Sequence, residues 1–122
     1  MERKILLVID MQNDFVDGVL GTKEAVLIVP SVVKKVKQLM SEGYEVIFTK
    51  DTHYEGYLST QEGINLPVKH CIKPEHGWEL VEELKDIQSK HNLKVVEKPG
   101  FGSMELANWL KNEDIKDPIK EI

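Results

Sequence analysis

The sequence lacks several features that would place it in a particular class of protein. Cys71 is its only cysteine, so no disulfide can form within the chain, as is usual in a reducing cytoplasm. The net charge is −5 and no basic stripe stands out, which argues against a nucleic-acid partner. The first apolar run, residues 5–9, is too short for a signal-peptide core or a membrane span. We therefore expect a cytoplasmic protein that binds neither nucleic acid nor a membrane.

What the sequence does contain is the composition of an ordinary globular domain. It has 122 residues, of which 41% are hydrophobic and 30% are charged. This is enough chain, and enough apolar side chain, for one hydrophobic core. No internal repeat, low-complexity tract or linker divides the chain. The composition therefore predicts a single domain over residues 1–122.

Strand-like and helix-like segments alternate along the chain. Residues 5–9 (ILLVI) form a run of branched apolar residues between charged ones, which is typical of a strand buried inside a parallel sheet. The spacing of apolar residues predicts a first helix over residues 31–42, with Pro30 in its first turn and Gly43 past its end. Further strands are predicted over residues 44–49 and 93–98 and approached at 117–122, with helices over 78–87 and 104–112 and a turn at 99–103. This order predicts an α/β fold with a parallel sheet, flanking helices and right-handed crossovers.

Three chemically useful side chains lie at predicted carboxyl ends of strands: Asp10, Asp51 and Lys98. In parallel sheets, ligands bind beyond these strand ends. A carboxylate that follows five apolar residues is partly desolvated, which suits a general base, and a nearby lysine would keep it ionised. Spacing alone leaves open a turn or helix-capping role for Asp10 and a surface position for Lys98.

Asp51, His53 and His70 are candidate metal ligands. Residues i and i+2 of an extended segment point to the same side, so Asp51 and His53 can bind one ion, with His70 as a third ligand. Three protein ligands with open positions are typical of a catalytic site. From spacing alone, the simpler interpretation is that the two histidines hydrogen-bond within a long loop.

Cys71 follows His70, but neighbours in an extended chain point apart, so the imidazole is badly placed to take the thiol proton. A small buried apolar role is the more usual one for a free cysteine. Phe15, Trp78 and Phe101 flank the predicted loops and could stack on a flat ligand, although such residues more often belong to the core.

Several motifs together resemble the isochorismatase-like cysteine hydrolases, with the nicotinamidases as the nearest named branch. They are LLVIDMQNDF at residues 6–15, KDTH at 50–53, LPVKHC at 66–71 with Gly77 and Trp78 shortly after, and Lys98 at the end of the third strand. The resemblance covers the whole chain in order. It implies a Rossmann-like, three-layer α/β fold and an enzyme that hydrolyses an amide or related C–N bond of a small molecule through a cysteine thioester.

The resemblance also implies roles for individual residues. Asp10 would accept the proton of the nucleophilic thiol, and Lys98 would support that carboxylate. One divalent ion (zinc, iron or manganese) would be bound by the set Asp51, His53 and His70. Phe15 would line the pocket for a small-molecule amide, and no organic cofactor is expected. Nicotinamidases usually carry a tryptophan where this chain has Leu66, so the resemblance does not name the substrate.

The nucleophilic cysteine of that family follows a later strand, and Cys71 matches a non-catalytic cysteine. The resemblance therefore implies that this chain lacks the nucleophile. We expect residues 1–122 to be the N-terminal part of a longer fold. An apolar strand such as residues 5–9 is stable only with a neighbouring strand on each edge. We expect a C-terminal segment, or another copy of the chain in a homo-oligomer, to supply the missing neighbour.

Two other classes remain as alternatives. In a phospho-receiver domain, Asp51 would be the phosphorylated residue and Asp10 and Lys98 its neighbours, but such a domain needs a second acid after Asp10, where this chain has Met11 and Gln12. The other alternative is a non-catalytic remnant that binds a ligand, a metal ion or a partner chain.

Overall fold

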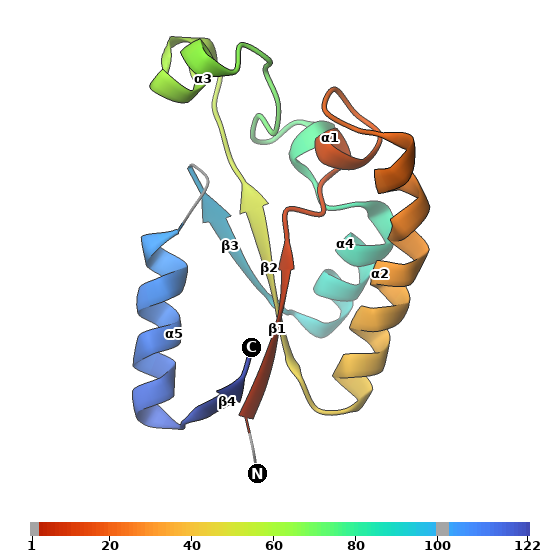
Figure 1. Cartoon of the computed structure of the whole chain (residues 1–122), viewed down its shortest axis with the longest axis vertical. Helices are drawn as coiled ribbons and strands as arrows, with labels where there is room; N and C mark the ends of the chain where they lie inside the picture. The colour runs from red at the N-terminus through yellow and green to blue at the C-terminus, as the bar shows by residue number, and fades with distance from the viewer. Residues whose placement is uncertain (1–2, 100–102) are drawn as a thin grey trace.

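The computed structural model describes residues 3–99 and 103–122. Within them, four strands form one parallel sheet in the order β3-β2-β1-β4 (Figure 1). The strands are β1 (Arg3–Ile9), β2 (Glu45–Asp51), β3 (Lys94–Lys98) and β4 (Ile119–Glu121). The predicted parallel α/β sheet is confirmed, and the second strand runs two residues further than predicted, as far as Asp51. Phe101 and most of the predicted turn at 99–103 lie outside the described residues.

Helices cover both faces of the sheet and make a three-layer structure (Figure 1). The longer helices are α2 (Lys23–Ser41), α4 (Glu82–His91) and α5 (Met104–Lys116), and the short ones are α1 (Asn13–Val16), α3 (Gln61–Asn65), η1 (Tyr57–Ser59) and η2 (His76–Trp78). Helices α2 and α4 pack on one face and α5 on the other. None of the helices in the described ranges is both long enough and apolar enough to cross a membrane.

The two faces of the sheet carry separate hydrophobic clusters, and these clusters show on which face each strand side chain lies. Phe48 belongs to the cluster beneath α2 and α4, whereas Ile47 and Val96 belong to the cluster beneath α5. Side chains alternate between faces along a strand. Asp51, four residues after Ile47, and Lys98, two residues after Val96, therefore lie on the α5 side of the sheet.

Two predicted helix starts are wrong. Helix α2 begins at Lys23, eight residues before the predicted start, because Thr22 caps it by accepting a hydrogen bond from the Ala25 amide at 3.0 Å. Pro30 therefore lies inside the helix, where it removes one backbone hydrogen bond. Helix α4 begins at Glu82, four residues later than predicted, because residues 76–78 form η2 instead.

One edge of β1 is only partly paired. Strand β2 pairs with it along residues 5–9, but on the other edge β4 pairs only at Arg3 and Lys4. Among the described residues no strand continues beside residues 5–9 on that edge. Ile5 and Val8 are buried as predicted, whereas Ile9, at the end of the run, is 60% exposed.

Candidate functional site

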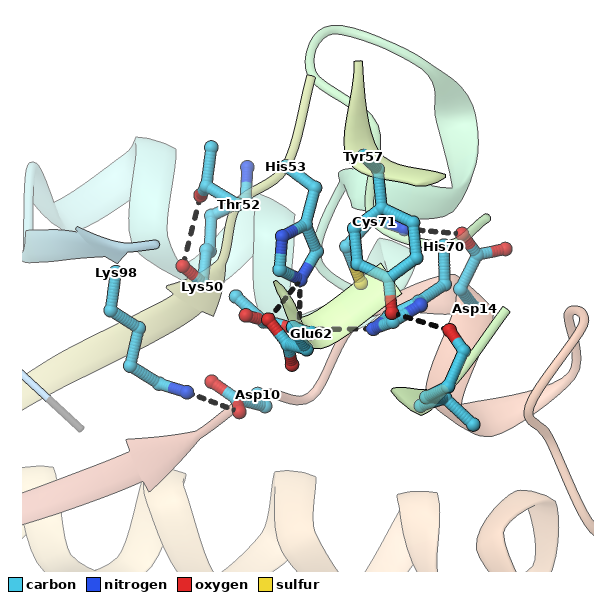
Figure 2. Close-up of polar contacts among 12 residues, drawn as sticks. Asp10, Asp14, Lys50, Thr52, His53, Tyr57, Glu62, His70, Cys71 and Lys98 are labelled. Carbon is cyan, nitrogen blue, oxygen red and sulfur yellow. Dashed lines mark hydrogen bonds and ion pairs between the residues drawn. The ribbon is translucent and has the colours of Figure 1, made fainter. Parts of the chain in front are cut away.

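The carboxyl ends of β1, β2 and β3 bring the three predicted side chains to one rim of the sheet. Asp51 and Lys98 are register partners across β2 and β3. Asp10 follows β1, and its amide donates a hydrogen bond to the Thr49 carbonyl at 3.2 Å. Figure 2 shows Lys98, at the end of β3, reaching toward Asp10 past the end of β2, which lies between β3 and β1. The chain thus gathers these groups by topology rather than by closeness in sequence.

Asp10 is held on both carboxylate oxygens. Lys98 Nζ donates to its Oδ2 at 2.6 Å, and the Thr49 hydroxyl donates to its Oδ1 at 2.8 Å. The Lys98 side chain is only 7% exposed and that of Asp10 is 22% exposed, so the ion pair is largely shielded from solvent. Asp10 also adopts a left-handed backbone conformation, φ 54°, which is uncommon outside glycine and concentrates at functional sites. This geometry presents an oriented carboxylate, hydrogen-bonded on both oxygens, at the rim.

The three predicted metal ligands converge, and a fourth acidic residue joins them. His53 Nε2 and His70 Nε2 lie 3.0 and 3.3 Å from Asp51 Oδ2. Glu62, on α3, places its Oε2 3.7 Å from His53 Nε2. One donor atom from each of the four residues lies within 4.8 Å of the other three. This set of two nitrogens and two oxygens is one that zinc accepts.

The hydrogen bonding of this cluster fits a bound cation. His70 Nδ1 lies 2.7 Å from the Val68 carbonyl, which can only accept, so Nδ1 carries a proton. With the proton on Nδ1, the Nε2 atom of a neutral His70 ring carries a lone pair, and this lone pair faces the Asp51 carboxylate. Within residues 3–99 and 103–122, Asp51 Oδ1 is buried and has no hydrogen-bond partner. A divalent ion among these atoms would give a partner to Asp51 Oδ1 and to the lone pair of His70 Nε2.

Glu62 was missed by sequence reasoning. It lies in a segment without periodicity, between the KDTH and LPVKHC motifs. The available signal was Thr60, which caps α3 by accepting a hydrogen bond from the Gly63 amide at 3.0 Å. That signal predicts a short helix but not which face of it meets His53.

Gln12, the glutamine of the IDMQNDF motif, is a second residue that sequence reasoning missed. It is fully buried, and its Nε2 donates to the carbonyls of Asp51 and Trp78, each at 2.8 Å. Its Oε1 accepts from the Asp51 amide at 2.9 Å. Gln12 therefore fixes the backbone of Asp51 from the neighbouring strand end.

Cys71 is buried, as predicted, and is not placed to act as a nucleophile. Its exposed fraction is 0%, and its amide donates to Asp14 Oδ2 at 2.8 Å (Figure 2). Burial raises the pKa of the Cys71 thiol far above its ordinary value, and the nearby carboxylates of Asp51, Asp14 and Asp10 raise it further. The thiol is therefore protonated at neutral pH.

The flanking aromatic residues Phe15 and Trp78 have different surroundings. The Phe15 ring meets the His70 ring edge-on, with centroids 5.6 Å apart, so Phe15 lies beside the metal-ligand cluster. Its predicted place in a substrate pocket stays a prediction. Trp78 is a core residue: it is 9% exposed, and the ammonium of the buried Lys50 lies 3.1 Å from its ring centroid.

An open pocket of about 540 Å³ adjoins the cluster. It is lined by His53, Thr60, Gln61, Glu62, Asn65, Leu66 and Pro99. Its size is in the range of small-molecule sites. Two of the candidate metal ligands thus face a space that a small ligand could enter.

The fold and the residues at this rim are those of one protein family. The model of the Isochorismatase domain family matches residues 4–119, and the chain belongs to that family. The resemblance inferred from the motifs is confirmed.

Individual relatives are nicotinamidases and pyrazinamidases. The nicotinamidase of Saccharomyces cerevisiae is 32% identical over 130 residues, which cover 80% of this chain and 57% of that protein. The nicotinamidase/pyrazinamidase of Bacillus subtilis is 26% identical with a TM-score of 0.79, over 91% of this chain and 66% of that one. The pyrazinamidase of Pyrococcus horikoshii, solved in complex with zinc, is 25% identical with a TM-score of 0.69, over 91% and 65%. The chain thus spans between about half and two thirds of the length of these relatives.

Proposed function

We propose that this chain provides the base, its lysine partner and the metal site of a nicotinamidase-like hydrolase. The reaction would be hydrolysis of an amide or related C–N bond in a small molecule. The observation that carries the proposal is the convergence of the Asp10–Lys98 pair and the four-residue metal-ligand cluster on one rim. Relatives whose names specify nicotinamidase or pyrazinamidase activity support it. Family membership leaves the phospho-receiver alternative without support.

In this mechanism Asp10 accepts a proton and later donates it. Its carboxylate would take the proton of an attacking thiol, and the thiolate would form a thioester with the carbonyl carbon of the substrate. The same proton would pass to the nitrogen that leaves as ammonia or an amine. Water would then cleave the thioester. Lys98 donates a hydrogen bond to one carboxylate oxygen of Asp10, and Thr49 holds the other oxygen in place.

The nucleophilic cysteine, by this proposal, lies outside residues 1–122. Cys71 is the one thiol of the chain, and burial and the surrounding carboxylates keep it protonated. Its amide is tied to Asp14, which holds its backbone in a left-handed turn of φ 50°. We propose that the 122 residues are the N-terminal part of a larger cytoplasmic enzyme, in which a further strand covers the free edge of β1.

Asp51, His53, Glu62 and His70 would hold one divalent ion. When bound, such an ion would supply a Lewis acid that orients the substrate, for example through a ring nitrogen. Leu66, at the rim of the adjoining pocket, offers an apolar contact but no aromatic ring. We therefore propose a small amide as the substrate without restricting it to nicotinamide.

The proposal is tested by measuring ammonia release from nicotinamide, pyrazinamide and other small amides. The natural protein is compared with its Asp10→Asn and Lys98→Met variants. We expect Asp10→Asn to lower kcat/KM by roughly 10²–10⁴, as loss of a general base does. Asp86→Asn, an exposed carboxylate on α4, is the matched control and should leave the rate unchanged. Full activity of Asp10→Asn would refute the mechanism.

The chain of 122 residues gives a second test. We expect it to bind about one zinc ion per chain by equilibrium dialysis, with no release of ammonia from any amide. Ammonia release by this chain alone would refute the proposed location of the nucleophile. Absence of zinc binding would refute the metal site but not the proton-transfer role of Asp10.

A further inference from the structure

Tyr57 is a buried aromatic residue to which the proposed reaction gives no role. It is 1% exposed, and its ring centroid lies 4.6 Å from that of His53 and 5.1 Å from that of His70. The two imidazole centroids are 4.9 Å apart. Figure 2 shows the Tyr57 ring beside both histidines. The three rings therefore form one packed group, in which Tyr57 contacts both imidazoles.

The hydroxyl of Tyr57 fixes the segment that leads to His70. It donates to the Leu66 carbonyl at 2.8 Å. Two residues later, the Val68 carbonyl accepts the hydrogen bond from His70 Nδ1 that sets the tautomer of this ring. The hydroxyl thus anchors the backbone just ahead of the group that directs His70 Nε2 at the cluster.

The backbone of Tyr57 seats the helix that carries Glu62. Its carbonyl accepts from the amide of Thr60 at 2.9 Å and from the Thr60 hydroxyl at 2.6 Å. Gly63 packs directly on the same carbonyl: a Cβ at this position would lie 2.0 Å from the Tyr57 oxygen. Because only glycine allows this approach, α3 and its Glu62 carboxylate are held close to the cluster.

We propose that Tyr57 is the positioning residue of the metal site: its ring orients His53 and His70, and its backbone seats Glu62 through the close contact with Gly63. The inference rests on the metal site proposed above. Residues that orient metal ligands set affinity as well as geometry, because ligands that are held in place lose less freedom when the ion binds.

The test is metal binding by the chain itself, with Zn²⁺ and Co²⁺ as the probes. We expect Tyr57→Leu to raise the zinc Kd about 10–100-fold, the usual effect of removing a residue that orients metal ligands. Tyr57→Phe keeps the ring and loses only the Leu66 hydrogen bond, so its Kd should rise less, by roughly two- to tenfold. Tyr44→Phe is the matched control, since its hydroxyl bonds Glu121 at a distant edge of the sheet. Its Kd should stay unchanged.

A purely structural role is separated by the visible spectrum of the cobalt-loaded chain. We expect Tyr57→Leu, saturated with Co²⁺, to show a changed ligand-field band, because ligand geometry has changed. A loss of stability alone would leave the band of the loaded protein as in the wild type. Circular dichroism of the metal-free variants confirms that each is folded.

Gly63→Ala tests the backbone contact. We expect it to raise the zinc Kd in the wild-type chain but to add little in a Glu62→Gln background, since it acts through Glu62. The inference is overturned if Tyr57→Leu binds zinc with the wild-type Kd and gives the wild-type cobalt band. If the wild-type chain itself binds neither ion, the metal site fails, and the role of Tyr57 fails with it.

Discussion

At the scale of single residues, the IDMQNDF motif is a set of connections to other strands and loops. Asp10 accepts from Lys98 at the end of β3, and Gln12 bonds the backbone of Asp51 at the end of β2. Asp14 accepts from the amide of Cys71, 57 residues later in the sequence. The polar side chains of one short segment thus join the ends of three strands to the loop that carries His70.

Replacing Gln12 tests this role. Gln12→Met keeps the approximate volume but leaves two carbonyls and one amide without partners in the core. We expect the free energy of unfolding in urea to fall by at least about 3 kcal/mol, since each of the three buried groups left unsatisfied costs about 1–3 kcal/mol. Gln38→Met is the control, at an exposed helix position where the Gln38 side chain donates to Glu42, and should change stability by less than about 0.5 kcal/mol. An equal effect of the two substitutions would contradict the assignment.

The raised pKa of Cys71 has its own consequence for stability. The folded-state pKa lies above the ordinary value of 9.0, so above that pH the unfolded chain ionises while the folded chain keeps its thiol protonated. The stability contributed is complete below pH 9 and is lost as the pH rises further. We expect the free energy of unfolding to fall more steeply between pH 8 and pH 10 in the wild type than in Cys71→Ala. Parallel slopes would show that the thiol titrates normally in the folded protein.

At the scale of elements, α2 shows how a strong cap and a packed face outweigh a breaker. Thr22 caps the helix, and Val29, Val32 and Val33 pack against the core beneath it. Pro30 is exposed between these residues. Residues 31–42 carry the same apolar spacing. The prediction from sequence was therefore correct for the second half of the helix, but it placed the start of the helix after the proline.

Pro30→Ala should stabilise the protein. Alanine restores the backbone donor that proline lacks and removes its clash with the preceding turn. We expect the free energy of unfolding to rise by about 1–3 kcal/mol, the upper end being the helix-propensity difference between the two residues. Ser31→Ala, the next exposed helix position, should change it by less than about 0.5 kcal/mol. A loss of stability in Pro30→Ala would mean that α2 requires a kink at this point.

At the scale of the whole molecule, the free edge of β1 sets the behaviour of the isolated chain. Residues 5–9 are apolar, and in the part of the chain that the structure describes, β4 pairs only with Arg3 and Lys4, which precede them. An unpaired apolar edge promotes pairing with other chains. A further strand in a larger protein, or a second copy of this chain, would cover it.

Charge at this edge should therefore reduce association. We expect sedimentation equilibrium to show concentration-dependent self-association of the 122-residue chain, and Ile9→Lys to weaken it by about tenfold or more. Ile115→Lys places the same charge at another exposed isoleucine, on α5, and should leave association unchanged. A chain that stays monomeric at all concentrations would contradict a role of the edge in self-pairing.

The sequence by itself determined the parallel α/β class, the strands and the identities of the rim residues. Strand cores are read from continuous apolar runs, and the carboxyl ends of parallel strands necessarily share one edge. These two features are enough to predict that Asp10, Asp51 and Lys98 lie together at one edge of the sheet. The burial of Cys71 followed in the same way from the ordinary behaviour of a free cysteine.

Only the tertiary structure decided how the loops complete the site. Glu62 joins the histidines because Gly63 lets α3 rest on the carbonyl of Tyr57. Gln12 fixes Asp51 because two strand ends lie side by side. These contacts join residues far apart in sequence through loops without periodicity, where local propensity carries no information about direction. The neighbour of the β1 edge is likewise not predicted by the sequence. The apolar pattern of residues 5–9 predicts that a strand pairs with this edge, but not which chain supplies that strand.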